Sequence, residues 1–561
     1  MSAAQIPATP IQARVAAFFD ELFPLDPVRA TATGDHRFDH TWPDMTEAGR
    51  EARLAFVDRW EAELQDIDPD RRSAGDRADR EVLLAELAAM RFTDAELREE
   101  RWDPMSWIYL LGGGIFPILA REFAPPAARL RSIAGRLETM PRLLEVAAGQ
   151  LQGLGDRPVS KLHTETALKN LPGIAELADD AVKAGEEAEG DADVRAMLPR
   201  LKKSAETAKA ALGKFEAHLR DVVLPKAEAE GRLGRELFDR KMRHTLKSDL
   251  SPLEILERAN REYVAVRREM VRLARENWLR YVPDRPMPTA ETAGTEEAAD
   301  SEIVRGVLDA IAAEHQKPDA MLDSPGPLDK KEKAFFAVTP IPEEWTPEQK
   351  ESYLREDNDR MLKLLVIHEA VPGHYLQGVF SNRCSSLART ILWSGVFAEG
   401  WAVYVTQVMM DAGYGADDPG LWLTHWKFYL RATTNAIIDV KIHTMDMTQD
   451  EAIALMVDGG FQEEAEARAK WNRARLSSTQ LVTYFVGSIE FWDIELERRR
   501  QLALEAGGPS AVDAVSAPRV VGGLGDTPGF VYRKHLEEVL AQGSPPMPVI
   551  RRLLLEERVP A

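Results

Sequence analysis

Two histidines and a glutamate stand close together in the segment from Met361 to Phe380, MLKLLVIHEAVPGHYLQGVF. An apolar run of helical character leads directly into His368 and Glu369, and His374 follows six positions after His368. Imidazole nitrogens are common zinc ligands, and a glutamate beside them can act as a general base. The segment therefore predicts a metal-dependent hydrolytic site.

The spacing of the two histidines differs from that of the familiar zinc-peptidase helix, in which they are four residues apart and project from one face. At about 100° per residue, the separation observed here places the second ring roughly 240° around an ideal helix. An undistorted helix cannot aim both rings at one ion. Pro372 clashes with the carbonyl four residues earlier, and Gly373 permits unusual torsions, so we expect a local break that returns His374 to the side of His368.

Glu399 is the predicted third metal ligand. It lies 25 residues after His374 in an apolar stretch, where a lone carboxylate would be costly to bury without a cation. A catalytic zinc usually takes three protein ligands and leaves a fourth position for water. The sequence predicts a Zn²⁺ site made by His368, His374 and Glu399, with Glu369 as general base. A salt-bridged structural role is the alternative for Glu399.

Other polar side chains could support this chemistry. Tyr484, His443 and Arg431 are candidate donors to the oxyanion that forms when water attacks a carbonyl. Asp439 could orient a ligand histidine from behind, and Gln377 is assigned the same role. Spacing alone leaves packing or surface roles equally open for Arg431, Asp439, His443 and Tyr484.

Charge and cysteine content narrow the class of protein. The chain has 561 residues with 71 Lys plus Arg against 92 Asp plus Glu, and this net charge of -21 disfavours nucleic acid and anionic membranes as partners. The one cysteine, Cys384, cannot form an internal disulfide, which fits a reducing compartment. No secretory signal or membrane-spanning run is evident, so we expect a cytoplasmic protein, with its oligomeric state left open.

The organisation of the chain follows from periodicity and length. Apolar residues recur at three- and four-residue spacing and strand signals are sparse, so we expect an all-α, predominantly helical fold. The 561 residues exceed the roughly 250 to 300 at which a single core stops growing, so two lobes are expected. An acidic stretch around 283–302 is the predicted boundary between a helical N-terminal region, 1–290, and a helical catalytic region, 300–561.

The sequences HEAVPGHYLQ, from His368, and EGWA, from Glu399, resemble the hallmark motifs of the domain of unknown function 885 family. Further likeness at residues 30–39 and 102–104 extends the resemblance over nearly the whole chain. It implies one family-wide helical fold, similar to neurolysin-like and carboxypeptidase Taq-like peptidases, with a deep active-site cleft over the metal. It also implies zinc metallopeptidase activity.

The resemblance extends to two later motifs, which imply an active-site wall. The matching positions are Arg431, Asp439, His443, Tyr484 and Gly487. The chain departs from the commoner family residues at Thr434, Lys441 and Phe485.

The leading expectation is a hydrolase that cleaves amide bonds of short peptides or peptide-like small molecules, because a deep cleft would exclude folded proteins. One alternative keeps the metal but changes the bond, as in an esterase or amidase that acts on a small non-peptide substrate. The other alternative is a catalytically silent metal-binding scaffold.

Overall fold

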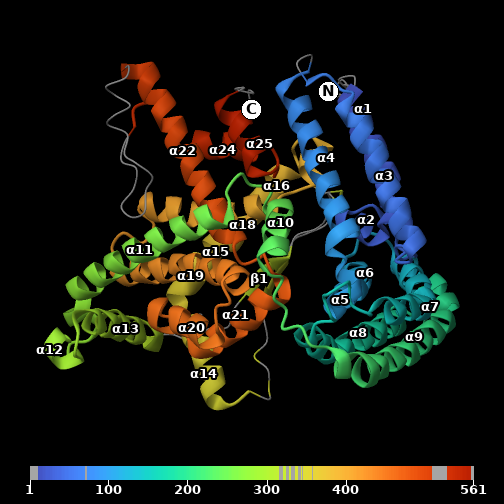
Figure 1. Cartoon of the computed structure of the whole chain (residues 1–561), viewed down its shortest axis with the longest axis horizontal. Coiled ribbons are helices and arrows are strands. Elements are labelled where there is room, and N and C mark those ends of the chain that lie inside the picture. Colours follow the sequence, from blue (N-terminus) through green and yellow to red (C-terminus); the bar gives the residue numbers. More distant parts are fainter. Residues whose placement is uncertain are drawn as a thin grey trace. The chain divides into compact units, whose positions relative to one another are not determined.

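The structure is a computed structural model, and it describes residues 10–69, 72–314, 320–323, 328–329, 335–338, 341, 343, 345–356, 358–507 and 527–556. Helices make up nearly all of the regular structure in these residues, which confirms the predicted all-α class (Figure 1). The strands of the described part, β1 (Ala320–Asp323) and β2 (Phe335–Val338), form an antiparallel pair in which Ala320 faces Val338.

The chain divides into two compact units. The first unit comprises Met1–Arg232, Pro325–Lys333 and Ser385–Ile391, and the second comprises Leu233–Ser324, Ala334–Cys384 and Leu392–Ala561. The division therefore lies earlier than the predicted boundary at 283–302. The physical reason is that α11 (Pro252–Tyr281) shares an apolar core with α13 (Glu296–Glu314) and α19 (Pro419–Thr444), so the acidic stretch is a link within the second unit.

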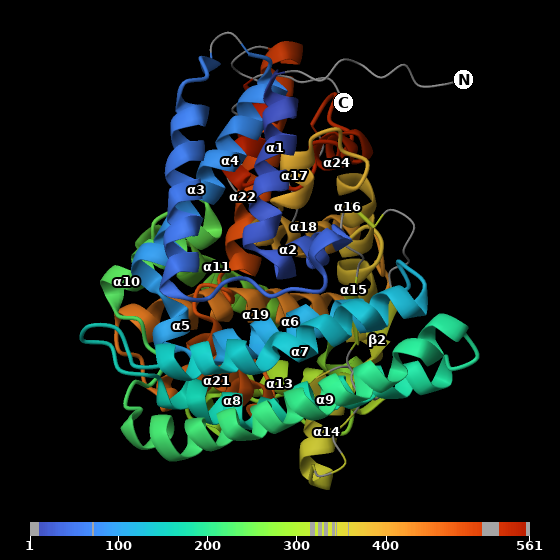
Figure 2. The ribbon, with the colours of Figure 1, turned by 90° about the vertical axis from the view of Figure 1, so that its right-hand side faces the viewer.

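Helices with apolar faces build the first unit. Phe18 packs edge-on against Trp60 with ring centroids 5.4 Å apart, and Phe56 joins both rings. Three long helices, α7 (Pro126–Gln150), α8 (Lys161–Glu187) and α9 (Ala192–His218), lie side by side in a second layer of this unit (Figure 2). The helices of the first unit are α1 (Pro10–Leu25), α2 (Pro27–Thr33), α3 (Glu47–Gln65), α4 (Ala74–Phe92), α5 (Glu99–Trp102), α6 (Pro104–Ala120), α7 (Pro126–Gln150), α8 (Lys161–Glu187), α9 (Ala192–His218) and α17 (Leu387–Ile391), with short 3-10 or π turns at His36–Phe38, Thr93–Leu97, Leu219–Val223 and Leu224–Lys226.

The second unit contains every residue assigned to the candidate metal site. Its remaining helices are α10 (Arg235–Leu246), α12 (Ala290–Ala293), α14 (Pro347–Glu356), α15 (Asp359–Glu369), α16 (His374–Ser381), α18 (Gly395–Asp411), α20 (Gln449–Ala454), α21 (Glu464–Ser477), α22 (Thr483–Gly507), α24 (Tyr532–Leu540) and α25 (Met547–Leu555), with a π turn at Leu455–Gly459.

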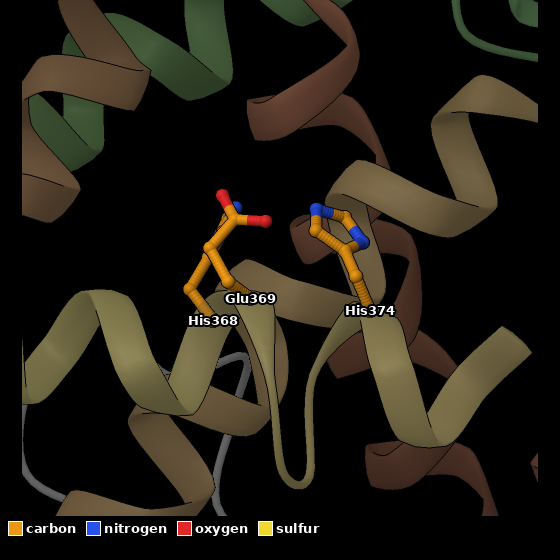
Figure 3. Close-up of side chains that lie close together, drawn as sticks. All are labelled: His368, Glu369 and His374. Carbon is orange, nitrogen blue, oxygen red and sulfur yellow. The ribbon is translucent and has the colours of Figure 1, made fainter. Parts of the chain in front are cut away.

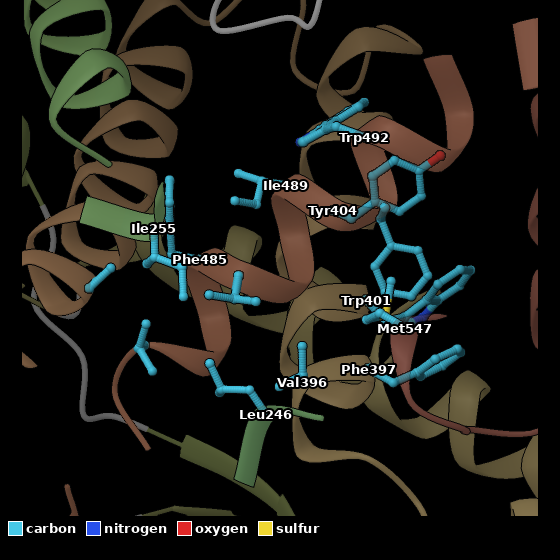
Figure 4. Close-up of a cluster of buried hydrophobic side chains, with 14 of the residues drawn as sticks. Leu246, Ile255, Val396, Phe397, Trp401, Tyr404, Phe485, Ile489, Trp492 and Met547 are labelled. Carbon is cyan, nitrogen blue, oxygen red and sulfur yellow. The ribbon is translucent and has the colours of Figure 1, made fainter. Parts of the chain in front are cut away.

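The core of the second unit is a cluster of large apolar side chains around α18 and α22 (Figure 4). Trp401 and Tyr404 of α18 pack against Phe491 of α22, with ring centroids 5.8 and 5.4 Å from it. Full burial of one such side chain contributes roughly 1.5–3 kcal/mol to stability. The two helices that carry Glu399 and Tyr484 thus pack against each other through this cluster.

The helices α18 and α22 touch backbone to backbone at two glycines. A Cβ atom on Gly400 would lie 2.3 Å from the Cα atom of Gly487, a distance that no side chain tolerates. Glu399 adjoins this contact, and Tyr484 lies one helical turn before it.

None of the described helices combines the length and the apolar content that crossing a membrane requires.

Candidate metal centre

Helix α15 delivers His368 and Glu369 at its C-terminal end. Asn358 begins the helix, since its side chain accepts hydrogen bonds from the backbone N–H groups of Arg360 and Met361. Burial of Met361 and other apolar residues at three-residue spacing then fixes the face of the helix that turns inward. His368 lies on that face and is buried, whereas Glu369 is half-buried.

The helix ends at Glu369, and a new helix, α16, begins at His374, so the expected local break is a complete interruption. The backbone folds back on itself between them: the N–H of Gly373 donates to the carbonyl of Ile367 at 3.0 Å. A Cβ atom on Gly373 would lie only 1.7 Å from the carbonyl oxygen of His368, so glycine is required there.

The break brings the two imidazoles together. The ring centroids of His368 and His374 are 4.9 Å apart with an interplanar angle of 84°. The side chains of His368, Glu369 and His374 point toward one another from two helices that the returning loop joins (Figure 3), and one potential ligand atom from each lies within 4.8 Å of the others. The geometric expectation for the histidine pair is confirmed.

Glu399 reaches the same place from α18, which Ser394 caps by accepting a hydrogen bond from the N–H of Phe397. Its Oε2 atom lies 3.5 Å from Nε2 of His374 and 3.9 Å from Nε2 of His368. The side chain is 25% exposed, so the expectation that this carboxylate is buried in apolar surroundings is met only in part. Two carboxylates, Glu369 and Glu399, therefore border the histidine pair.

The two histidines have opposite protonation tendencies. Burial, together with the positive charges of His374 and Arg431, lowers the pKa of His368 well below its usual value. Burial also acts against the charged form of His374, but the hydrogen bond and the negative charge of Glu399 outweigh it and raise that pKa. His368 is thus held in the neutral form that a metal ion requires.

The donor set fits a divalent zinc-like ion. Two imidazoles and a carboxylate are the ligand types of catalytic zinc sites, and His368 is neutral and buried. Its Nδ1 atom is buried and, among the described residues, makes no hydrogen bond of ordinary geometry, although the carbonyl of Ala402 lies near enough to favour a proton on the ring. A proton on Nδ1 leaves Nε2, the nitrogen that faces Glu399, as the ligand atom.

Tyr484, at the start of α22, lies within electrostatic reach of Glu399. Its hydroxyl oxygen lies 3.5 Å from the guanidinium of Arg473 and 3.5 Å from the side-chain amide of Gln480, and it accepts from both. Burial raises the pKa of the phenol, and the negative charge of Glu399 raises it further. The phenol therefore keeps its proton at neutral pH.

His443 has a structural role in place of the predicted contact with substrate. Its Nδ1 atom accepts from the backbone N–H of Leu233 at 3.2 Å, and its Nε2–H donates to the carbonyl of Ala474 at 3.1 Å. The buried ring also stacks on Phe238. Both nitrogens are used by the backbone, which corrects the prediction of an oxyanion donor.

Asp439 and Gln377 bond to parts of the framework of the second unit in place of the predicted ligand histidine. Asp439 accepts from the N–H groups of Thr479 and Val482, both at 3.1 Å, and so holds the turn that leads into α22 and Tyr484. Gln377 donates to the hydroxyl of Ser544, which fastens α16 within the second unit.

Arg431 belongs to a buried cluster of charges that no local sequence pattern indicates. Its guanidinium lies 3.0 Å from a carboxylate oxygen of Glu466 and 3.6 Å from one of Glu356. Lys427 pairs with Glu356 at 2.8 Å, and Lys470 pairs with Glu466 at 2.9 Å. These residues come from α14, α19 and α21, so no local motif announces the cluster.

Comparison with known families and structures gives a consistent result. The family described as "Bacterial protein of unknown function (DUF885)" matches residues 27–298 and 284–554. A solved structure of a candidate lipoprotein of unknown function from Shewanella oneidensis is 28% identical and superimposes with a TM-score of 0.78 over 98% of this chain and 100% of its own. A candidate lipoprotein from Colwellia psychrerythraea, 16% identical, shares the fold with a TM-score of 0.71 over 97% of this chain and 98% of its own.

Comparison with curated proteins returns no match. The family matches together cover most of the sequence and include the histidine pair, Glu399 and Tyr484. The chain therefore belongs to the DUF885 family.

Proposed function

We propose that this protein is a zinc-dependent hydrolase that cleaves amide bonds of short peptides. The observation that carries the proposal is that two imidazoles and two carboxylates from α15, α16 and α18 lie close together. The loop that interrupts the helix between α15 and α16 brings the histidines together, and it requires glycine at position 373.

The two carboxylates receive different roles. Glu399 would complete the metal site with His368 and His374, because one oxygen of its carboxylate approaches both Nε2 atoms. Glu369 would be the general base, since it adjoins a ligand in sequence and lies near both histidines. Zinc in such a site acts as a Lewis acid, which makes water a nucleophile near neutral pH and polarises a carbonyl.

The chain's own groups would then move the protons. Glu369 accepts the proton of the attacking water and passes it to the nitrogen of the leaving amine as the amide C–N bond breaks. Tyr484 accepts hydrogen bonds from Arg473 and Gln480, so its own hydrogen can be donated to the oxyanion.

The roles of the two carboxylates are tested by paired isosteric variants. Glu369→Gln should keep about one zinc per chain and lose about 10²–10⁴-fold in kcat, because only the proton acceptor is removed. Glu399→Gln should lose the metal itself. Zinc content and turnover of peptide and ester libraries are measured on both variants, with the exposed Glu257→Gln as control.

Undiminished turnover by the Glu369→Gln variant would remove the assigned base. If Glu369→Gln lost the zinc while Glu399→Gln kept it, the roles would be exchanged. Turnover of esters but not peptides would favour the esterase alternative, and zinc-loaded protein that hydrolyses neither would favour a metal-binding scaffold.

The description of both similar structures as candidate lipoproteins does not accord with the predicted cytoplasmic location, which stays a prediction for this chain.

A further inference from the structure

A small polar cavity is lined by residues of α13, α14, α15 and α19 in the second unit. Its volume is about 20 Å³, which is enough for a group of roughly the size of a water molecule but not for a whole ligand. The charged side chains of its lining are three cations and three carboxylates, namely Arg305, Arg355, Lys427, Asp309, Glu356 and Glu463.

Glu356 gives this lining a hydrogen-bond acceptor that has no donor. Its side chain is only 4% exposed, and its Oε2 atom accepts from the ammonium group of Lys427 at 2.8 Å. The Oε1 atom is buried and accepts no hydrogen bond from the described residues, and the guanidinium of Arg431 lies 3.6 Å from it, beyond hydrogen-bond distance. A buried carboxylate oxygen in this condition favours a ligand that brings a donor.

The donor that suits Glu356 best is a positively charged one. Burial opposes ionisation of the carboxyl group, but the positive charges of Lys427 and Arg431 outweigh burial and lower its pKa, so the group is charged at neutral pH. Hydrogen bonds between two charged groups are stronger than neutral ones. An ammonium group is about as large as a water molecule, so the volume of the cavity admits it.

Arg305 provides the complementary group in the same lining. Its side chain is 41% exposed, and its guanidinium donates to the carbonyl of Val457 at 3.0 Å. Its one ion pair within the described residues is with Asp458, which lies 3.7 Å away and is 80% exposed, so water screens that pair. The fork of N–H donors can therefore take a carboxylate of a ligand.

The cavity is separate from the candidate metal centre. Met361 lines the cavity, and it lies seven positions before His368 on α15. Seven residues correspond to about 10 Å along a helix, or two turns. A ligand of a few atoms in the cavity therefore does not occupy the position of the metal.

We propose that this cavity binds a free α-amino acid, with the ammonium group on Glu356 and the carboxylate on Arg305. A free amino acid carries both charges close together, as the acceptor and the donor fork are placed around one small cavity. The ammonium group fills the buried part, and the carboxylate lies at the more exposed Arg305. This inference goes beyond the proposed function, because it holds whether or not the metal centre cleaves peptides.

Calorimetry with the full-length protein tests the proposal. Each of the common amino acids is titrated, and the one that binds most tightly is compared with its amide and its N-acetyl derivative. The amide lacks the carboxylate and the N-acetyl compound lacks the ammonium group, so each should bind at least about tenfold more weakly, a difference of about 1.4 kcal/mol. Failure of every amino acid to bind at millimolar concentration would overturn the proposal and leave water as the partner of Glu356.

The titrations are repeated after zinc has been removed with a chelator, because an amino acid can also bind to a metal ion. Affinity that persists without zinc belongs to the cavity and supports the proposal. Affinity that disappears with zinc belongs to the metal centre and would overturn it. The result does not depend on turnover, so it is distinct from the tests of the proposed function.

Two variants separate the two ends of the ligand. Arg305→Gln removes the partner of the carboxylate, so the amino acid should bind no better than its amide, while affinity for the amide stays unchanged. Glu356→Gln removes the charge that faces the ammonium group, so the amino acid and its amide should both bind at least about tenfold more weakly. Arg468→Gln, an exposed residue of α21 paired with Glu464, is the control and should change neither affinity.

Helical circular dichroism is recorded for each variant, since Glu356 is buried beside Lys427. If the Glu356→Gln variant fails to fold, Arg305→Gln still decides, because that side chain is only half-buried. An unchanged ratio of acid to amide affinity in the Arg305→Gln variant would overturn the proposed orientation and with it the site.

Discussion

Several carboxyl groups in the second unit hold their protons near neutral pH because they are buried. Burial raises the pKa of Glu490 to about 8, against the effect of a hydrogen bond from Ser248. Burial likewise raises the pKa of Asp439 and of Glu262 to about 7. One carboxylate oxygen of Glu490 is buried without a hydrogen-bond partner in the described part of the chain, as a protonated group tolerates.

Glu490→Gln tests this burial directly, because glutamine imitates the neutral acid. The folded pKa of Glu490, about 8, lies above the ordinary value of 4.5, so the folded wild type binds more protons than the unfolded chain between these values. The free energy of unfolding of the wild type therefore falls through that window, by at most about 1.4 kcal/mol per pH unit from this residue. The variant lacks this slope and should gain stability relative to wild type up to about pH 8.

Urea unfolding followed by tryptophan fluorescence at several pH values measures the difference. Glu257→Gln, an exposed change in the same unit, should keep the wild-type pH dependence. Parallel pH dependences for wild type and the Glu490→Gln variant would show that Glu490 ionises normally in the folded protein.

The sequence predicted the histidine pair because a His-Glu dipeptide and a Pro-Gly break are local signals. It also indicated Tyr484, by family likeness, and the structure places that phenol near Glu399. It misplaced His443, because the partners of this residue, Leu233 and Ala474, lie far from it along the chain. Glu466 and Lys470 were missed for the same reason, because the charge cluster that contains them also takes residues from α14 and α19.

At the level of elements, the geometry of the site depends on the interruption between α15 and α16. Gly373→Ala should force the returning loop open, since the added Cβ atom would lie 1.7 Å from the carbonyl oxygen of His368. The imidazoles then separate, and zinc affinity should fall by about 10–100-fold, as when a supporting group of a metal site is lost. Titration with a competing chelator measures the affinity.

Gly378→Ala is a matched control in α16, because nothing lies within 4 Å of the added Cβ atom. It should keep the affinity for zinc and stabilise the helix by up to about 1 kcal/mol. Unchanged zinc binding by the Gly373→Ala variant would mean that the loop does not govern the approach of the two rings.

Helix type was predictable from apolar periodicity, whereas the division of the chain was not. The acidic stretch at 283–302 carries the composition of a linker, yet α11 before it and α13 after it share one apolar core with Trp278 and Val304 inside. The composition of a segment indicates only whether that segment is exposed to solvent. The division of the chain depends on packing between helices that are distant in sequence, and here α11 and α13 both pack against α19.

At the scale of the whole molecule, the proposed metal donors all belong to three helices of the second unit. Zinc at 100 times its dissociation constant should stabilise the binding unit by about 2.7 kcal/mol. Hydrogen exchange measured by mass spectrometry should therefore slow in 359–381 and 395–411 when zinc is added, and stay unchanged in α7 to α9. Added chelator should reverse the effect.

The Glu399→Gln variant is the control, because exchange in it should not respond to zinc. Equal slowing throughout both units would indicate that the ion binds elsewhere or acts on the whole chain.

The meeting of Gly400 with Gly487 has a consequence for the two helices that carry Glu399 and Tyr484. Two peptide backbones that already touch cannot come closer, so α18 and α22 rest at a lower limit of separation. Thermal breathing of the bundle can draw the two backbones apart at this point, but it cannot push them together. The contact therefore works as a mechanical stop for the helices that carry Glu399 and Tyr484, and their separation here can vary in one direction only.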